Sequence, residues 1–163
     1  MGHKVYIGIG SNLEKEKNIR SCIALLHKNY HNIVVSPVYE TESMGFDGPN
    51  FYNLVSSFDT EQDIYALKEQ LKKIENKYGR NFNETKFSSR TLDIDILYYD
   101  DLVLSNEKID IPRKEIIEYD FVLKPLIDIA ADFIHPNLNM SHIEIMAKHS
   151  IKKQIISKID LDL

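Results

Sequence analysis

The first residues of the chain change from a strand pattern to a helix pattern. Bulky apolar residues alternate with small or polar ones over residues 5–9, which predicts a half-buried strand. A turn, Gly10-Ser11-Asn12, interrupts it, and Asn12 is placed to cap a helix that should begin near Glu14. The predicted helix carries an apolar stripe at helical spacing, formed by Ile19, Ile23, Leu26 and Tyr30.

The next segments alternate between strand, loop and helix patterns. Residues 33–41 are rich in β-branched side chains but contain Pro37, so they predict an edge strand, where a missing backbone donor is tolerated. Residues 42–50 contain glycine and proline without periodicity and predict a loop that could close as a lid. A strand pattern resumes over residues 51–58. From Thr60 onward we expect a helix that ends at Gly79 and buries Ile64, Leu67, Leu71, Ile74 and Tyr78.

The order of these patterns predicts the fold class. Residues 80–89 are polar and irregular, and residues 91–99 predict a strand. Beyond them we expect a short hairpin over 102–104 and 108–111, and helical segments near 115–118, 121–131 and 141–148. We therefore predict an α+β protein with a ferredoxin-like βαββαβ core: an antiparallel sheet with helices packed on it, followed by a C-terminal hairpin and helices.

Composition limits the class of protein. A length of 163 residues suits one domain spanning 1–163, and 43% apolar with 28% charged residues is typical of globular proteins. The chain lacks an eighteen-residue apolar run and an N-terminal signal pattern, so we expect a cytoplasmic protein without a membrane partner. The net charge of −5 argues against a nucleic-acid partner, because phosphate backbones select basic surfaces. Small molecules are the expected partners.

Two carboxylates on one strand are the strongest chemical signal. Because strand side chains alternate, Asp93 and Asp95 should share one face with their Cβ atoms roughly 7 Å apart. Carboxylate oxygens are the ligands that Mg²⁺ prefers, and Arg90 just upstream could grip phosphate oxygens. An ordinary solvated sheet face is the alternative interpretation of the same spacing. The pattern alone leaves both open.

Five motifs occur together in the chain: Gly10-Ser11-Asn12-Leu13, Phe51-Tyr52-Asn53, Gly79-Arg80, the segment from Arg90 to Asp95, and the segment from Phe121 to Leu126. In this order, from Val5 to about Ala131, they resemble the 6-hydroxymethyl-7,8-dihydropterin pyrophosphokinases of the folate pathway. The resemblance implies a ferredoxin-like enzyme that uses ATP as co-substrate. It would transfer the pyrophosphoryl group to the hydroxymethyl group of the pterin and release AMP, and we expect a monomer.

The same resemblance implies roles for individual residues. Asp93 and Asp95 would hold two Mg²⁺ ions, and Arg80 and Arg90 would steady the phosphates, so that these four form the catalytic set. The remaining residues beside the nucleotide would be Glu75, Ile96, Lys108 and Arg113. In the pterin site, Asn53 would read the edge of the ring, and the other contacts would come from Thr41, Met44, Phe51 and Phe121. Phe51 and Asn53 are two residues apart on a predicted strand and so share a face.

The chain departs from the family pattern around the phosphates and the adenine. Phe82 stands where a second arginine is common, and Phe87-Ser88-Ser89 replaces a Trp-Gly-Pro segment. Arg113 replaces a histidine after the proline, and Tyr119 replaces an arginine. Two other interpretations remain: a nucleotidyltransferase, which would release pyrophosphate, and a non-catalytic binding module of the same fold.

Overall fold

An antiparallel sheet forms the middle layer of the protein. The computed structural model describes residues 2–43, 45, 47–78 and 92–163. Among these residues, six strands pair in the order β10-β3-β4-β1-β5, and β2 also pairs with β4. The pairs are antiparallel. The strands are β1 (His3–Ser11), β2 (His31–Val35), β3 (Val38–Thr41), β4 (Phe51–Thr60), β5 (Asp93–Tyr99) and β10 (Ile155–Ile159).

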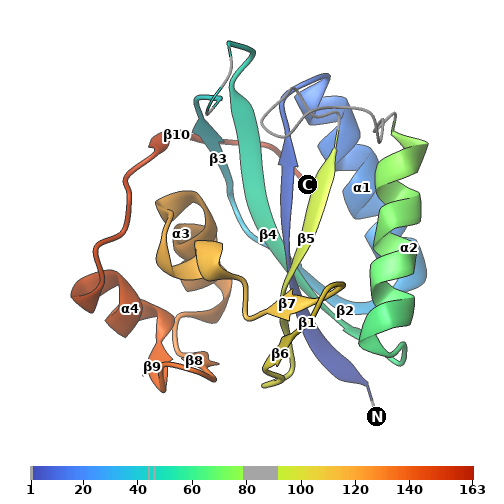
Figure 1. Ribbon diagram of the computed structural model, residues 1–163. Helices are drawn as coiled ribbons and strands as arrows, with labels where there is room; N and C mark the ends of the chain where they lie inside the picture. The colour runs from blue at the N-terminus through green and yellow to red at the C-terminus, as the bar shows by residue number, and fades with distance from the viewer. Residues whose placement is uncertain (1, 44, 46, 79–91) are drawn as a thin grey trace.

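Helices cover both faces of this sheet (Figure 1). On one face lie α1 (Lys15–Asn29) and α2 (Ile64–Lys77), and on the other lie α3 (Asp120–Ala130) and α4 (His142–Lys148). Each face has its own apolar cluster, because strand residues alternate between the two sides. Val5, Ile7 and Ile9 of β1 face α1 and α2, whereas Tyr6 faces the α3 side. The predicted antiparallel sheet with packed helices is confirmed, as a mixed α/β fold.

The helix α2 begins later than the sequence predicts. Thr60 does not start α2, because it continues β4 opposite His3. The helix starts after Asp63, whose carboxylate accepts hydrogen bonds from the backbone N–H groups of Tyr65 and Ala66. The predicted start was therefore too early, while the apolar stripe along the helix is buried as expected.

The predicted cap of α1 is also wrong. Glu14, with a left-handed φ of 45°, occupies the N-cap position of that helix and makes no side-chain capping bond. Asn12 is buried and donates instead to the carbonyl of Pro49 at 3.1 Å. It therefore ties the turn after β1 to the loop that precedes β4.

The predicted edge strand over residues 33–41 is divided into β2 and β3 around Ser36 and Pro37. Within the described part of the chain β2 pairs with β4 alone, but β3 lies between β4 and β10. The edge assignment is therefore wrong for β3, because β10 was not predicted and adds to its free side. The proline lies between the two strands, where it interrupts no ladder.

The C-terminal third holds short elements: one hairpin packs with the α1–α2 cluster, and the helices and a second hairpin lie on the α3 side of the sheet. The predicted hairpin is present as β6 (Leu104–Ser105) and β7 (Asp110–Ile111), followed by a 3₁₀ helix, η1 (Lys114–Ile117). A second hairpin, β8 (Ile134–His135) and β9 (Met140–Ser141), was not predicted. The predicted helices near 121–131 and 141–148 correspond to α3 and α4. Within the described residues, no helix is long and apolar enough to cross a membrane.

Two buried histidines join α4 and the second hairpin to the sheet. His142 is fully buried; its Nδ1 lies 2.7 Å from the carbonyl of Ala130 and its Nε2 lies 3.0 Å from the hydroxyl of Tyr98. This pairing suits a neutral ring that donates through Nδ1 and accepts through Nε2. Burial lowers the pKa of His142, and burial together with nearby His142 and His149 lowers the pKa of His135 to about 4.

These histidines should make the protein less stable as the pH falls from about 6.5 toward 4. Their pKa values are lower in the folded than in the unfolded chain, so the unfolded chain binds more protons in that window. Each histidine that stays neutral in the fold adds about 1.4 kcal/mol per pH unit to the slope. Urea unfolding at pH 7, 6 and 5 measures it, and His135→Asn should flatten the curve. An equal slope in parent and variant would contradict this assignment.

Candidate active site

Gly8 and Gly10 of β1 leave a strip without side chains on the α3 face of the sheet. Gly10 on β1 lies opposite Asp93 of β5 on one side and opposite Asn53 of β4 on the other. Residues directly opposite in an antiparallel sheet point to the same face. Gly8, two residues earlier, lies opposite Asp95 in the same way. The carboxylate pair and the amide of Asn53 therefore stand on either side of two glycines.

Gly10 keeps this strip open. A Cβ atom at that position would lie 3.4 Å from Oδ1 of Asn53 and 3.9 Å from a ring carbon of Phe51. At Gly8 the nearest atoms to such a Cβ belong to Leu97, at 3.6 Å and beyond. A side chain at Gly10, but not at Gly8, would therefore occupy space directly beside Asn53 and Phe51.

The amide end of the strip gathers the predicted pterin residues that the structure describes. Nδ2 of Asn53 donates to Oγ1 of Thr41 at 2.9 Å, which fixes the direction of the amide plane. Thr41 lies opposite Phe51 in the β3–β4 pair, so both point to the same face. Phe121 lies in the first turn of α3, and this helix packs over β3 and β4. The structure therefore brings Thr41, Phe51 and Asn53 together, with Phe121 on the helix above.

A cavity of about 310 Å³ lies at the carboxylate end, around the outer edge of β5. It is bounded by α2, by β5 and by the segment that leads through β7 to Arg113. All described residues predicted for the metal and nucleotide line this cavity: Glu75, Asp93, Asp95, Ile96, Lys108 and Arg113. The structure therefore brings these residues together, and their roles stay a prediction.

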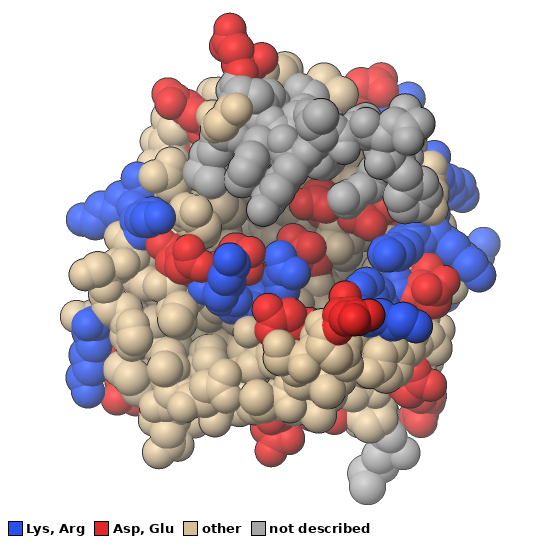
Figure 2. Space-filling model, in the orientation of Figure 1, with Lys and Arg blue, Asp and Glu red and all other residues tan. Residues whose placement is uncertain are grey.

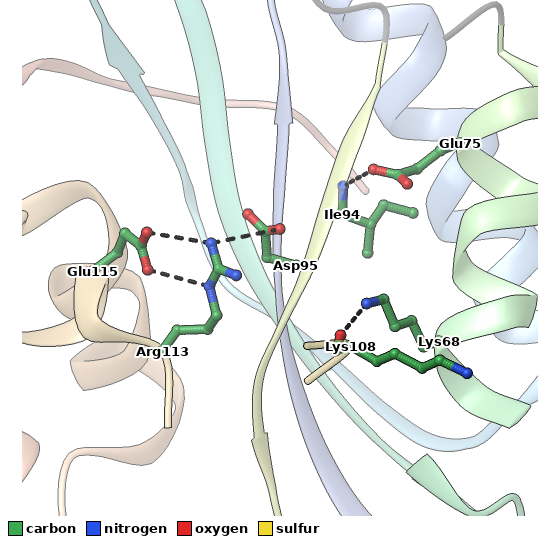
Figure 3. Close-up of polar contacts among 7 residues, drawn as sticks. All are labelled: Lys68, Glu75, Ile94, Asp95, Lys108, Arg113 and Glu115. Atoms are coloured by element: carbon green, nitrogen blue, oxygen red, sulfur yellow. Dashed lines mark hydrogen bonds and ion pairs between the residues drawn. The ribbon is translucent and has the colours of Figure 1, made fainter. Parts of the chain in front are cut away.

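Glu75 connects α2 to the edge of β5. Its side chain is buried, and its Oε2 accepts a hydrogen bond from the backbone N–H of Ile94 at 2.8 Å (Figure 3). Alternate residues of a strand direct their backbone N–H and C=O groups to the same edge. Ile96 is two residues after Ile94, so its backbone groups also point to the outer edge of β5, toward the cavity. Glu75 thus holds the strand edge while Ile96 lines the space beside it.

Arg113 lies where the carboxylates meet the cavity. Its guanidinium makes two contacts of 3.2 Å with Glu115, and its Nη2 lies 3.9 Å from Oδ1 of Asp95 (Figure 3). Burial opposes the charged form, but the carboxylates of Asp95 and Glu115 outweigh it and raise the pKa of Arg113. Arg113 is therefore a fixed cation beside the carboxylate pair.

Sequence comparison identifies the family. Residues 6–131 match the family model of 7,8-dihydro-6-hydroxymethylpterin-pyrophosphokinase. The chain belongs to this family. It is 33% identical over 136 residues to the 2-amino-4-hydroxy-6-hydroxymethyldihydropteridine pyrophosphokinase of Haemophilus influenzae. The match covers 81% of this chain and 84% of that protein. The enzyme of the same name from Bacillus subtilis is 35% identical over 133 residues, covering 79% of each.

Other relatives are much longer than this chain. A folic acid synthesis protein of Dictyostelium discoideum is 36% identical over 139 residues, which cover 84% of this chain and 21% of that protein. The fold matches a crystal structure of Plasmodium falciparum HPPK-DHPS with pterin and p-hydroxybenzoate at a TM-score of 0.72 and 14% identity. That match covers 91% of this chain and 43% of the other chain, and supports the fold alone.

Two further lysines line the cavity of this pyrophosphokinase, and the sequence analysis missed them. Lys68 and Lys72 lie one helical turn apart on α2, and Lys68 donates through Nζ to the backbone carbonyl of Lys108. Partial burial and then the cations Lys72 and Arg113 lower the pKa of Lys68. Lys68 and Lys72 lie seven and three residues before Glu75, and on a helix this spacing places all three side chains on the same side. The sequence could therefore have indicated that they belong together.

The cavity is thus lined by side chains of both charges. Its carboxylates come from α2, β5 and β7, and its cations are Lys68, Lys72, Lys108 and Arg113. Basic and acidic side chains also alternate across the middle of this face of the molecule (Figure 2). An ATP–magnesium complex carries both signs of charge, so such a cavity suits it.

Asp93 and Asp95 are compatible with magnesium. The side chain of Asp95 is 45% exposed, which leaves room for water and phosphate ligands. Within the described ranges, no group of three His, Cys, Asp or Glu side chains could enclose a metal ion. Mg²⁺ does not need such a cage, because it usually binds one or two carboxylates and completes its shell with water and substrate phosphates.

Part of the predicted site lies outside the described residues. Met44, Arg80 and Arg90 lie outside the described residues, as do Phe82 and the segment 87–89. The loop prediction over 42–50 agrees with its described residues, which form no helix or strand.

Proposed function

We propose that this chain transfers the pyrophosphoryl group of ATP to the hydroxymethyl group of 6-hydroxymethyl-7,8-dihydropterin, in a Mg²⁺-dependent step of folate synthesis that releases AMP. One observation carries the proposal: Gly10 lies between Asp93 and Asn53 in register. A pterin held by Asn53 would extend its hydroxymethyl group across the glycine toward the carboxylate pair. Family membership supports the same reaction.

We also propose that the core is ferredoxin-like. The support is the sheet order β3-β4-β1-β5 with antiparallel pairing, and the positions of α1 and α2 on the same face. We further expect the protein to act as a cytoplasmic monomer on small molecules, without nucleic-acid or membrane partners.

The pterin would lie over β3 and β4. Phe51 and Phe121 would stack on its two faces, and the amide of Asn53 would pair with donors and acceptors at the ring edge. Thr41 supports this geometry because it already holds Nδ2 of Asn53. Main-chain groups near Thr41 and Met44 would complete this side of the site.

The triphosphate would lie between β5 and the lysines that line the cavity. Asp93 and Asp95 would hold two Mg²⁺ ions, which would neutralise phosphate charge and lower the pKa of the pterin hydroxyl. Arg113 is oriented by Glu115 to contact a phosphate beside Asp95. Lys68, Lys72 and Lys108 would face the AMP portion, and the backbone of Ile96 beside Glu75 would face the base. Arg80 and Arg90 would add phosphate contacts.

In the proposed reaction the hydroxymethyl oxygen attacks the β-phosphorus of ATP. The bond from that phosphorus to the oxygen bridging to the α-phosphate breaks, and AMP leaves with the electron pair. The hydroxyl proton is released to solvent. Negative charge grows on the AMP phosphate, where the cations of α2, the hairpin and Arg113 would stabilise it.

A product assay tests the proposal. The purified protein with Mg²⁺, ATP and the pterin should form AMP and pterin diphosphate in equal amounts, and AMP formation should cease without the pterin. Free pyrophosphate as the product would identify a nucleotidyltransferase. Binding of ATP without turnover would identify a non-catalytic module.

Asn53→Ala should weaken pterin binding by about 10- to 100-fold and leave ATP affinity within about twofold. The buried ring edge would lose its partner, and an unpaired polar group costs about 1–3 kcal/mol. Calorimetric titration of each ligand measures both values. Asn29→Ala, on the exposed side of α1, is the control. Equal weakening of both ligands would show that Asn53 supports the fold and not the pterin.

A further inference from the structure

Phe121 is backed by a second aromatic ring. The rings of Tyr119 and Phe121 are stacked, with centroids 5.1 Å apart and planes 24° from parallel. Nζ of Lys152 lies 5.3 Å from the centroid of Tyr119. A cation and two rings therefore follow one another: Lys152, then Tyr119, then Phe121. Such contacts restrict a ring to one orientation.

The C-terminal segment 152–155 fixes this stack to the start of α3. Backbone hydrogen bonds run from Lys152 N to the carbonyl of Glu118 at 2.8 Å, and from Asp120 N to the carbonyl of Lys152 at 3.0 Å. The carboxylate of Asp120 accepts the N–H groups of Gln154 at 2.8 Å and Ile155 at 3.3 Å. The helix start that carries Phe121 is therefore held to this segment by both backbone and side-chain hydrogen bonds.

The same segment continues into the sheet beside the pterin strands. Ile155 is the first residue of β10 and lies opposite Thr41 of β3. One short stretch of chain thus contacts both Thr41 and the start of α3. It sets the spacing between the sheet, which carries Phe51 and Asn53, and the helix, which carries Phe121.

We propose that Tyr119 is a positioning residue for the pterin. Held by Lys152 and the segment 152–155, it covers one face of the Phe121 ring, so that the pterin stacks on the opposite face. The inference rests on the proposed role of Phe121. The family match ends at residue 131, so it does not assign a role to Lys152 or to the segment 152–155. Tyr119 itself departs from the arginine common in the family, so its role belongs to this chain.

Tyr119→Leu should raise the KM and the Kd for the pterin by about two- to tenfold, since an aromatic pair contributes that much beyond simple burial. The kcat at saturating pterin and the Kd of ATP should stay within about twofold, because Tyr119 does not line the cavity. Tyr119→Phe keeps the stacked ring and should restore the parent KM. Lys152→Ala should shift the KM in the same direction by a smaller factor.

Matched variants separate this inference from the proposed function. Tyr65→Leu removes an exposed tyrosine of α2 and controls for loss of an aromatic side chain. Lys153→Ala controls for Lys152→Ala, since both lysines are exposed neighbours. Calorimetry with 6-hydroxymethylpterin, Mg²⁺ and a non-hydrolysable ATP analogue gives the affinities, and steady-state kinetics give KM and kcat.

The outcomes are distinct. Higher pterin KM in Tyr119→Leu, with recovery in Tyr119→Phe, supports the positioning role. An unchanged pterin KM in Tyr119→Leu, or an equal loss of ATP affinity, overturns it.

Phe121→Ala tests the pterin site itself and is measured beside these variants. If Phe121→Ala leaves pterin affinity unchanged, the proposed pterin site is wrong. If Phe121→Ala weakens the pterin and Tyr119→Leu does not, only the role of Tyr119 fails. Should Tyr119→Leu not fold, Lys152→Ala decides alone by the same pterin KM.

Discussion

Replacing Asp95 with alanine should lower turnover by about 1,000-fold and leave the protein folded. Metal-assisted stabilisation of phosphate charge is worth several kcal/mol, and each factor of ten in rate corresponds to about 1.4 kcal/mol. Stability should change by less than about 1 kcal/mol, because the Asp95–Arg113 contact is long and half-exposed and Arg113 keeps Glu115. Steady-state assays and urea unfolding measure the two effects.

Asp101→Asn is the matched control for this variant. Asp101 is an exposed aspartate in the turn directly after β5 and does not line the cavity. The turnover of the Asp101→Asn variant should therefore equal that of the parent. Asp95→Ala with undiminished turnover would remove Asp95 from the metal site. A collapse of stability in the same variant would instead show that the carboxylate serves the fold.

Gly10→Ala should lower pterin affinity by about 10- to 100-fold while the protein folds normally. The added methyl group would lie 3.4 Å from Oδ1 of Asn53, in the strip that the pterin would cross. Overfilling a packed site costs about 1–3 kcal/mol, which gives the expected factor. Folding should not suffer, because no backbone strain is involved and alanine restricts the unfolded chain, adding about 0.5 kcal/mol of stability.

Gly8→Ala provides the comparison for Gly10→Ala. It adds the same methyl group to the same strand and the same face, but against Leu97 rather than Asn53. Pterin affinity measured by calorimetry should therefore fall much less than in Gly10→Ala. Equal losses in both variants, or no loss in Gly10→Ala, would contradict a pterin position over Gly10.

Features that depend on local spacing were predictable from the sequence. Asp93 and Asp95 share a face because strand side chains alternate, whatever the rest of the fold does. The apolar stripes of α1 and α2 follow from helical spacing in the same way. The start of α2 was missed because Thr60 and Asp63 are both acceptable caps, and only the pairing of Thr60 with His3 decides between them.

Features that depend on distant contacts were not predictable. β10 is five residues long and half-exposed, and it becomes a strand by pairing with β3 more than a hundred residues earlier. The bare strip at Gly10 needs the register of β1 with both β4 and β5. Lys68 and Lys72 could be assigned to one side of α2, but their place in the cavity depends on where the β6–β7 hairpin folds.

The most direct test of the proposed reaction follows the β-phosphorus of ATP. With ATP labelled at that atom, Mg²⁺ and 6-hydroxymethyl-7,8-dihydropterin, the label should appear in the pterin diphosphate while unlabelled AMP is released. Attack at the γ-phosphorus would leave the label in ADP, and attack at the α-phosphorus would leave it in free pyrophosphate. Label in either of those two products would contradict pyrophosphoryl transfer by this chain.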